Sequence, residues 1–187
     1  MLSGKKLLCC GILRHELEHL LGDQNFNITY LDAALHVDFD KLAQSVTADL
    51  RDMGDGYNPV VIGNQCHPEM EQMVAKYGGR VIRAKSCIEM LMGEKMAELD
   101  AEAKTFYLTS GWLENWRQIF REGLGWDAID ARQNFGYYDR ILLLDTGIIP
   151  IDDIDLLEFY DYAQVPVEIV SVDLNNLRQL LDQLLGG

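Results

Sequence analysis

The chain has 187 residues, of which 48% are hydrophobic and 25% are charged, and this composition is typical of a soluble globular protein with a substantial buried core. Its formal net charge of −14 repels phosphate backbones and anionic lipid headgroups, so we expect neither nucleic acid nor a membrane as a partner. No apolar run is long enough to span a bilayer, and the opening MLSGKKLLCCGIL lacks a signal-peptide cleavage site. We therefore expect a cytoplasmic protein.

Seven short runs of aliphatic and β-branched residues predict strands, and the segments between them have the spacing of amphipathic helices. The predicted strands cover residues 6–13, 26–32, 58–64, 80–84, 104–111, 139–147 and 165–173. The acidic segment 150–162 predicts a surface helix, and the leucine-rich segment 174–185 predicts a closing helix.

The alternation of strands and helices, with several strands apolar along most of their length, is typical of a parallel sheet covered on both faces. Neither a flexible linker nor a repeat interrupts the sequence, so we expect residues 1–187 to form a single three-layer, Rossmann-like α/β domain. No glycine-rich phosphate-binding motif follows any predicted strand, which argues against nucleotide binding.

The segment HELEH, residues 15–19, matches the pattern by which zinc peptidases hold a metal between two histidines one helical turn apart. Glu18, however, stands where the peptidases carry an uncharged residue, and no third ligand follows at the usual spacing. The alternative is an exposed helix face that carries His15 and His19 while neighbouring leucines pack inward.

Three of the four cysteines follow three different predicted strands. Cys10 ends the first strand, Cys66 follows the third, and Cys87 follows the fourth, so all three are expected at the carboxyl edge of the sheet, where open α/β sheets bind ligands. Cys66 and Cys87 are also expected at helix amino ends, which would lower their pKa values and favour the thiolates that bind metals. The alternative is that each cysteine is a small buried hydrophobic residue, as we expect for Cys9.

Five segments, CCGILRHELE, LDAALHVDFDKL, VIGNQCHPEME, RVIRAKSCIEMLMG and TFYLTSGWLENW, together resemble the uncharacterised family known as domain of unknown function 1638. The resemblance covers most of residues 6 to 116, and the chain departs from the family pattern at Ser86 and at Asn64-Gln65. It implies an anaerobic archaeon or bacterium and a role near corrinoid-dependent methyl transfer. The positions that it singles out are Cys10, Glu16, His36, Cys66, Cys87, Gly93, Thr109, Gly111 and Trp112.

The first functional hypothesis is a zinc or iron–sulfur site held by Cys10, Cys66 and Cys87, with a fourth position for His36, for His67 or for a small molecule. The second is an accessory protein that binds a cofactor, a small molecule or a corrinoid-related protein without catalysis. Its ligand would meet the side chains and backbone donors of Glu16, His67, Thr109, Ser110, Gly111 and Trp112. The zinc peptidase is the third hypothesis, and the sequence leaves the metal, the reaction and the oligomeric state open.

Overall fold

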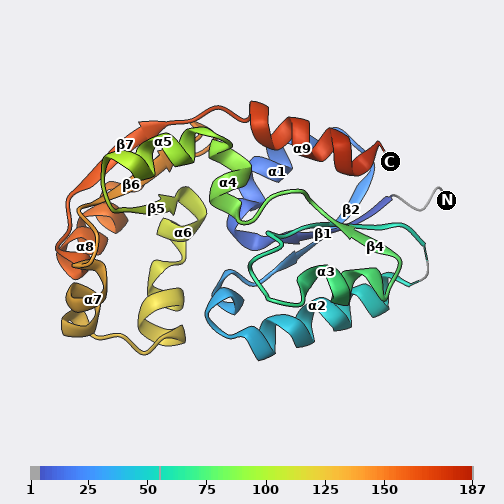
Figure 1. Cartoon of the computed structure of the whole chain (residues 1–187), viewed down its shortest axis with the longest axis horizontal. Helices are drawn as coiled ribbons and strands as arrows, with labels where there is room; N and C mark the ends of the chain where they lie inside the picture. The colour runs from blue at the N-terminus through green and yellow to red at the C-terminus, as the bar shows by residue number, and fades with distance from the viewer. Residues whose placement is uncertain (1–4, 55, 187) are drawn as a thin grey trace.

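The computed structural model describes residues 5–54 and 56–186, and in this part of the chain strands alternate with helices (Figure 1). The strands are β1 (Lys5–Cys10), β2 (Phe26–Leu31), β3 (Asn58–Val61), β4 (Gly79–Val81), β5 (Thr105–Thr109), β6 (Arg140–Asp145) and β7 (Val167–Ser171). The α-helices are α1 (Arg14–Leu21), α2 (Phe39–Met53), α3 (Met70–Ala75), α4 (Cys87–Met92), α5 (Lys95–Glu102), α6 (Ser110–Glu114), α7 (Ala128–Phe135), α8 (Asp153–Ala163) and α9 (Asn175–Leu185). Two short 3₁₀ helices, η1 (Gly11–Leu13) and η2 (Ala33–Val37), and a π-helical turn, η3 (Arg117–Gly123), complete the described elements.

All seven predicted strands are present, and every pair of neighbouring strands is parallel. The predicted α/β class with a mainly parallel arrangement is therefore confirmed. The strands form two sheets, however, in the orders β2-β1-β3-β4 and β5-β6-β7, where the sequence analysis expected one. The apolar runs identify strands but not their pairing partners. Two successive helices, α4 and α5, separate β4 from β5 and carry the chain to the second sheet.

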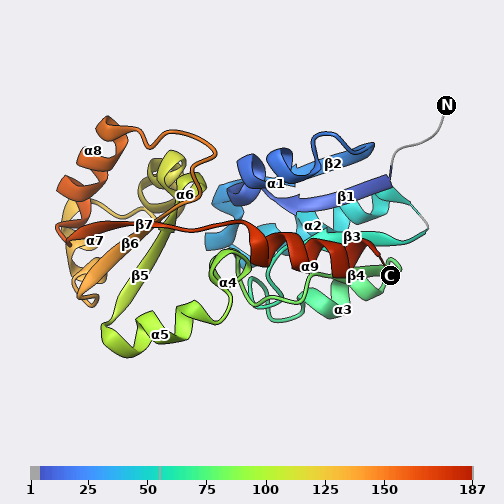
Figure 2. The same ribbon diagram turned by 90° about the horizontal axis from the view of Figure 1, so that it is seen from above.

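Helices cover both faces of the first sheet, with α2 and α3 on one side and α1 and α9 on the other (Figure 1). In the second sheet α5 lies on one side, and α6 and α8 lie on the other (Figure 2). None of the helices in the described ranges has the length and apolar character that crossing a membrane requires.

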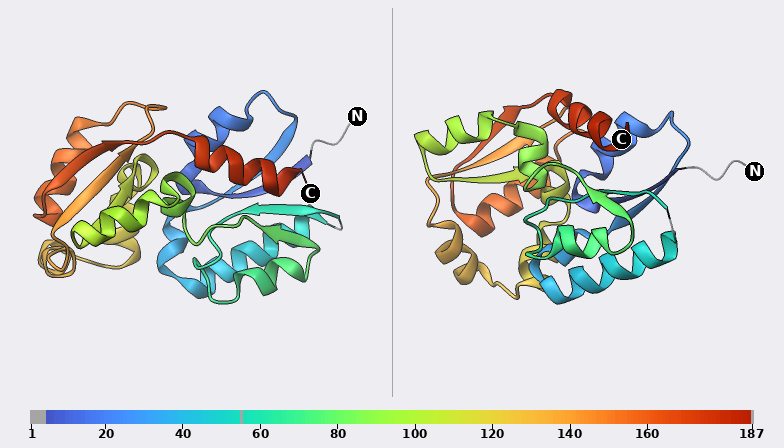
Figure 3. Two further views of the ribbon diagram at one scale, coloured as in Figure 1. Left: turned by 45° about the horizontal axis from the view of Figure 1, so that its top comes forward. Right: turned by 45° about the vertical axis from the view of Figure 1, so that its right-hand side comes forward.

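The last helix returns to the first sheet after the chain has completed the second (Figure 3). The predicted inward leucines Leu177, Leu181 and Leu184 are buried, and Leu180 is partly buried. The side-chain amide of Asn176 donates hydrogen bonds of 3.0 Å to the carbonyl oxygens of Glu89 and Met90. These contacts fix α9 against α4, which follows the last strand of the first sheet.

The two sheets point their carboxyl ends at each other, so that β1 and β5 both run toward the middle of the molecule (Figures 1 and 2). Gly111, in the first turn of α6, lies so close to η1 that a Cβ atom built there would overlap the backbone carbonyl oxygen of Ile12. Only glycine allows this approach without moving one of the two backbones. The residues that follow the strands of both sheets are therefore brought to one place.

Candidate functional site

The carboxyl ends of the strands bring together a set of residues that we call the thiol cluster. Its members come from five different strand ends and are Cys10, His36, Cys66, Cys87 and Trp112. Cys10 and Cys87 are 2% and 5% exposed, whereas Cys66 is only partly buried. Cys9 is fully buried in the core beside Cys10, so the two neighbouring cysteines of β1 have different surroundings, as the pleat of a strand predicts.

His36 lies at the centre of this cluster. Its Nε2 atom is 3.4 Å from the Cys10 sulfur, and its ring centroid is 5.9 Å from that of Trp112. Its Nδ1 atom is 3.1 Å from the carbonyl oxygen of Ala33, to which it donates a hydrogen bond. Because Nδ1 is held by the backbone, Nε2 is the nitrogen that remains for the sulfur atoms.

His36 lies in a short helix after β2 that is capped by a side chain at its amino end. The Asp32 side chain accepts a 2.8 Å hydrogen bond from the Ala34 backbone N–H and so caps η2 at its amino end. This short helix turns the chain back toward β1, and His36 sits in its last turn.

The loop after β3 and the segment after β4 are held together by backbone hydrogen bonds. Asn64 donates to the carbonyl oxygen of Ala84 at 2.9 Å, and Gln65 donates to that of Lys85 at 3.1 Å. A Cβ atom at Gly63 would overlap the Lys85 carbonyl oxygen, so the close approach depends on this glycine. The pairing brings Cys66 beside the segment that leads into Cys87.

Burial raises the pKa of Cys10 to about 12, although the backbone N–H groups of Ile12 and Leu13 act in the opposite direction. Burial and the neighbouring Cys10 raise the pKa of Cys87 to about 12 as well, against a hydrogen bond from the Trp112 side chain. The prediction that a helix amino end would lower the pKa of Cys87 is therefore wrong. Withdrawal from water outweighs the few donors that α4 offers this thiol.

Burial opposes a positive charge on His36, yet the pKa of this histidine is raised. The causes are a hydrogen bond and a charge interaction with Cys66, together with the bond to Ala33. His36 thus contacts Cys10 directly, its pKa is raised by Cys66, and the pKa of Cys87 is raised by Cys10. One contact and two electrostatic interactions relate the three predicted cysteines to the predicted histidine.

Three thiols and one imidazole form a soft donor set that suits zinc or an iron–sulfur cluster. Two ligands of one tetrahedral zinc, at the usual Zn–S and Zn–N bond lengths, would lie about 3.6 Å apart. The observed 3.4 Å between Cys10 Sγ and His36 Nε2 is close to this value. As the side chains stand, however, the described ranges contain no group of three or more His, Cys, Asp or Glu residues placed to hold a metal ion.

Cys66 also lines an open cavity of about 670 Å³. Its walls come from the loops after β3 and β4, from α4 and α5, and from α9. Cys10 and Cys87 do not line this cavity. Of the three thiols in the cluster, Cys66 is thus the one that a small molecule in this cavity can reach.

A family model for "Protein of unknown function (DUF1638)" matches residues 30–181, which is most of the chain. The protein belongs to the DUF1638 family. This confirms the resemblance drawn from the sequence. No curated protein and no solved structure matches the chain.

Glu16 of this DUF1638 protein is 1% exposed and lies on α1, shortly after Cys10 in the sequence. Its Oε1 atom accepts a 3.0 Å hydrogen bond from the hydroxyl of Thr146, which follows β6. Its Oε2 atom is buried without a hydrogen-bond partner among the described residues. Glu16 therefore links the edges of the two sheets, and nothing in the sequence indicated that Thr146 would be its partner.

The segment after β5 contributes mainly to the shape of the site. The Thr109 hydroxyl caps α6 by accepting a 3.2 Å hydrogen bond from the Trp112 backbone N–H. The Ser110 hydroxyl is buried and has no hydrogen-bond partner in the described part of the chain. Trp112 stacks on Phe120, and it also lies against His36 and lowers the pKa of Cys87. It therefore covers one side of the thiols, and its contact with a ligand stays a prediction.

The remaining predicted residues have other partners. His67 accepts a 3.0 Å hydrogen bond from the Glu69 backbone N–H and packs edge-on against Phe39. These contacts hold His67 in its own loop, so His36 is the histidine that joins the cluster. In HELEH, His15 Nε2 pairs with Glu114 at 2.8 Å and His19 is exposed. The zinc-peptidase hypothesis gains no support from these contacts.

Proposed function

We propose that this DUF1638 protein binds a zinc ion or an iron–sulfur cluster through Cys10, His36, Cys66 and Cys87. The observation that carries the proposal is the Cys10–His36 contact, since its 3.4 Å length also suits two ligands of one metal. Metal binding requires the other side chains of the cluster to rearrange, and it requires buried thiols to lose their protons. Metal affinity should therefore rise with pH.

When bound, such a centre supplies Lewis-acid or electron-transfer chemistry. The residues themselves act in simpler ways. His36 is oriented by the Ala33 carbonyl, Trp112 excludes water from one side of the sulfur atoms, and Cys66 opens the site toward the 670 Å³ cavity. The anaerobic setting that the family resemblance implies would keep the thiols reduced.

The cavity favours a second candidate, a small-molecule or cofactor-binding protein without a metal. A volume of about 670 Å³ lies within the range of roughly 300–1,000 Å³ that is usual for small-ligand sites. In this case the thiols of Cys10 and Cys87 would remain protonated core groups. A corrinoid-related protein would be a partner of either candidate.

The two candidates are separated by metal analysis of protein purified without oxygen and without added metal. The metal-site proposal predicts zinc, or iron with sulfide, in stoichiometric amount. Cys10→Ala should lose it and Cys9→Ala should retain it, because the two residues are adjacent and buried but only Cys10 belongs to the thiol cluster. Wild-type protein that carries no metal and takes up none would leave the second candidate.

A further inference from the structure

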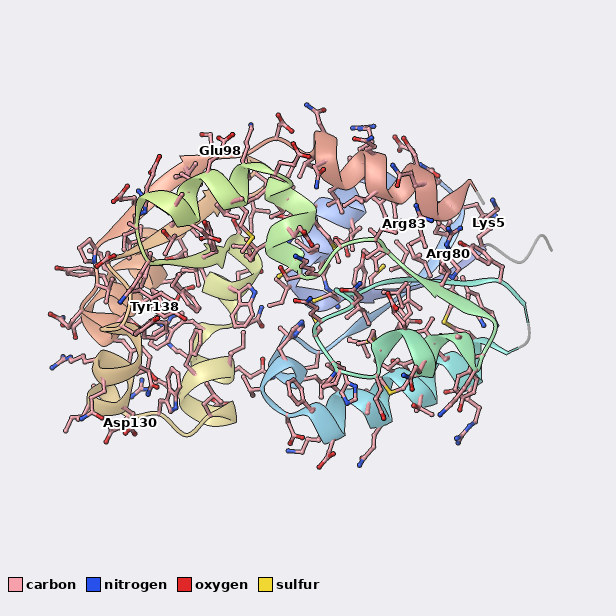
Figure 4. The ribbon with its side chains drawn as sticks, in the orientation of Figure 1. Lys5, Arg80, Arg83, Glu98, Asp130 and Tyr138 are labelled. Carbon is pink, nitrogen blue, oxygen red and sulfur yellow. The ribbon has the colours of Figure 1, made fainter. Side chains whose placement is uncertain are left out.

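The cavity beside Cys66 has an uneven distribution of charge. Arg83 and Lys85 line it, both are exposed, and the charged side-chain nitrogens of neither have a carboxylate oxygen within 4.0 Å in the described part of the chain. Arg83 also lines a neighbouring cavity of about 330 Å³ together with Arg80. Figure 4 shows Arg80 and Arg83 near each other below α9. A chain with a net charge of −14 thus places two cationic side chains that lack a carboxylate partner next to its accessible thiol.

Two of the three carboxylates that line the same cavity accept hydrogen bonds within the protein. Glu89 accepts a hydrogen bond from the Lys85 backbone N–H, and Asp100 accepts a 2.7 Å bond from the Tyr107 hydroxyl. Glu94 is the third acidic residue of the lining, and it lies at the α4–α5 turn. The side-chain cations of Arg83 and Lys85, by contrast, have no ion-pair partner among the described residues.

The apolar part of the lining comes from Ala84, Met96, Ala97 and Leu180, and Gln65, Ser86 and Asn176 add uncharged polar groups. A site that combines two cations without a carboxylate partner, several apolar side chains and a thiol suits a small molecule with a compact anionic group and a short apolar body. We propose that this cavity binds a small organic anion, a carboxylate or a phosphate ester, with Arg83 and Lys85 on the charged group and Cys66 beside the ligand. The role of Cys66 as the entrance to the metal centre rests on the proposed function.

Two alkylating reagents of nearly the same shape test this directly, iodoacetate and its uncharged amide, iodoacetamide. In both cases the Cys66 thiolate attacks the methylene carbon, a C–S bond forms, the C–I bond breaks and iodide leaves. Peptide mass spectrometry resolves Cys66 from the other three cysteines. The quantity measured is the rate ratio of iodoacetate to iodoacetamide at Cys66 in the metal-stripped folded protein, divided by the same ratio in the unfolded chain.

We expect this normalised ratio to be about three to ten at low salt, because the side chains of Arg83 and Lys85 attract the charged reagent at close range. High salt should reduce it. The double variant Arg83→Gln/Lys85→Gln should bring it to one or below, whereas Arg51→Gln, on α2 and outside the cavity, should leave it unchanged. A wild-type ratio at or below one, a ratio unaffected by the double variant, or a Cys66 that reacts with neither reagent would overturn the proposal.

Two further arms complete the design. Protection of Cys66 from iodoacetamide by butyrate but not by inorganic phosphate identifies a carboxylate site, and the reverse identifies a phosphate site. Metal content of the double variant separates this proposal from the metal centre. Since Arg83 and Lys85 are not in the thiol cluster, the variant should retain all of its metal whether or not it loses the preference for iodoacetate.

Discussion

The two sheets contribute different chemistry at the place where their carboxyl ends meet. The first sheet supplies the thiols and the imidazole, Cys10, His36, Cys66 and Cys87. The second supplies an indole, two hydroxyls and a glycine from the segment 109–112, and behind them lies a set of packed aromatic rings. Those rings belong to Phe106, Trp116, Phe120, Phe135 and Phe159. The edge of the first sheet therefore carries the reactive groups, and the edge of the second sheet shapes and shields them.

The largest effect is expected where the two edges touch. Gly111→Ala would push a methyl group into the Ile12 carbonyl, and because both atoms belong to backbone, we expect a loss of about 3 kcal/mol in the free energy of unfolding. Urea titration followed by circular dichroism measures it. Ser110→Ala is the matched control and should change stability little, since it removes a buried hydroxyl that has no hydrogen-bond partner in the described ranges. Equal stability of the two variants would contradict the close approach.

The buried thiols at the edge of the first sheet should make the free energy of unfolding depend on pH. The pKa of Cys10 and that of Cys87 are raised from 9.0 to about 12 in the folded chain, so between these values the unfolded chain releases protons that the folded chain keeps. Stability is then fully present below about pH 9 and falls as the pH rises toward 12, by up to about 1.4 kcal/mol per pH unit for each thiol.

Urea denaturation of wild type and of Cys87→Ala is compared at a series of pH values. The difference between the two proteins isolates the contribution of the Cys87 thiol, because tyrosines and lysines that titrate in the same pH range are present in both. The variant should lose stability less steeply above pH 9. Parallel curves for the two proteins would show that Cys87 ionises as easily in the folded chain as in the unfolded one.

A smaller effect is expected at the hydrogen bond that crosses between the edges. Thr146→Val removes the donor to Glu16 and leaves its buried carboxyl group without a hydrogen-bond partner in the described ranges, at a cost of about 1–3 kcal/mol. Glu16→Leu in the same background should recover part of the loss, because no unpaired buried polar group then remains at this position. If Thr146→Val is as stable as wild type, the two edges are not connected through this bond.

Much of the fold could be predicted from the sequence because strands and helices are local patterns. Each of the seven apolar runs became a strand, and Leu177, Leu181 and Leu184 pack inward as their spacing indicated. The division into two sheets could not be predicted, since Thr105 pairs with Arg140 and Leu8 with Val60 through contacts that no local pattern encodes. That residues 1–187 behave as a single domain stays a prediction.

The candidate site, like the sheets, could be predicted only as far as local sequence patterns reach. The carboxyl ends of parallel strands share one edge of a sheet, and from this the sequence predicted that Cys10, Cys66 and Cys87 lie at the same edge, as they do. The family resemblance singled out His36 and Trp112 as well. The contacts of Glu16 with Thr146 and of His15 with Glu114 join residues far apart in sequence, and no motif pointed to them. The raised pKa of Cys87 was missed because burial of a thiol depends on the packing around it and not on its position at a helix end.

The proposed metal centre uses four side chains at the edge of the first sheet, Cys10, His36, Cys66 and Cys87. Cobalt(II) titration of the metal-stripped protein under anaerobic conditions is the sharpest test, because thiolate-to-cobalt absorption in the near ultraviolet reports the number of bound sulfurs and the visible bands report tetrahedral geometry. We expect one equivalent of cobalt bound by three thiolates, loss of one thiolate's absorption in Cys87→Ala, and an unchanged spectrum in Cys9→Ala. A spectrum without thiolate absorption, or one that Cys10→Ala, Cys66→Ala and Cys87→Ala all leave intact, would contradict it.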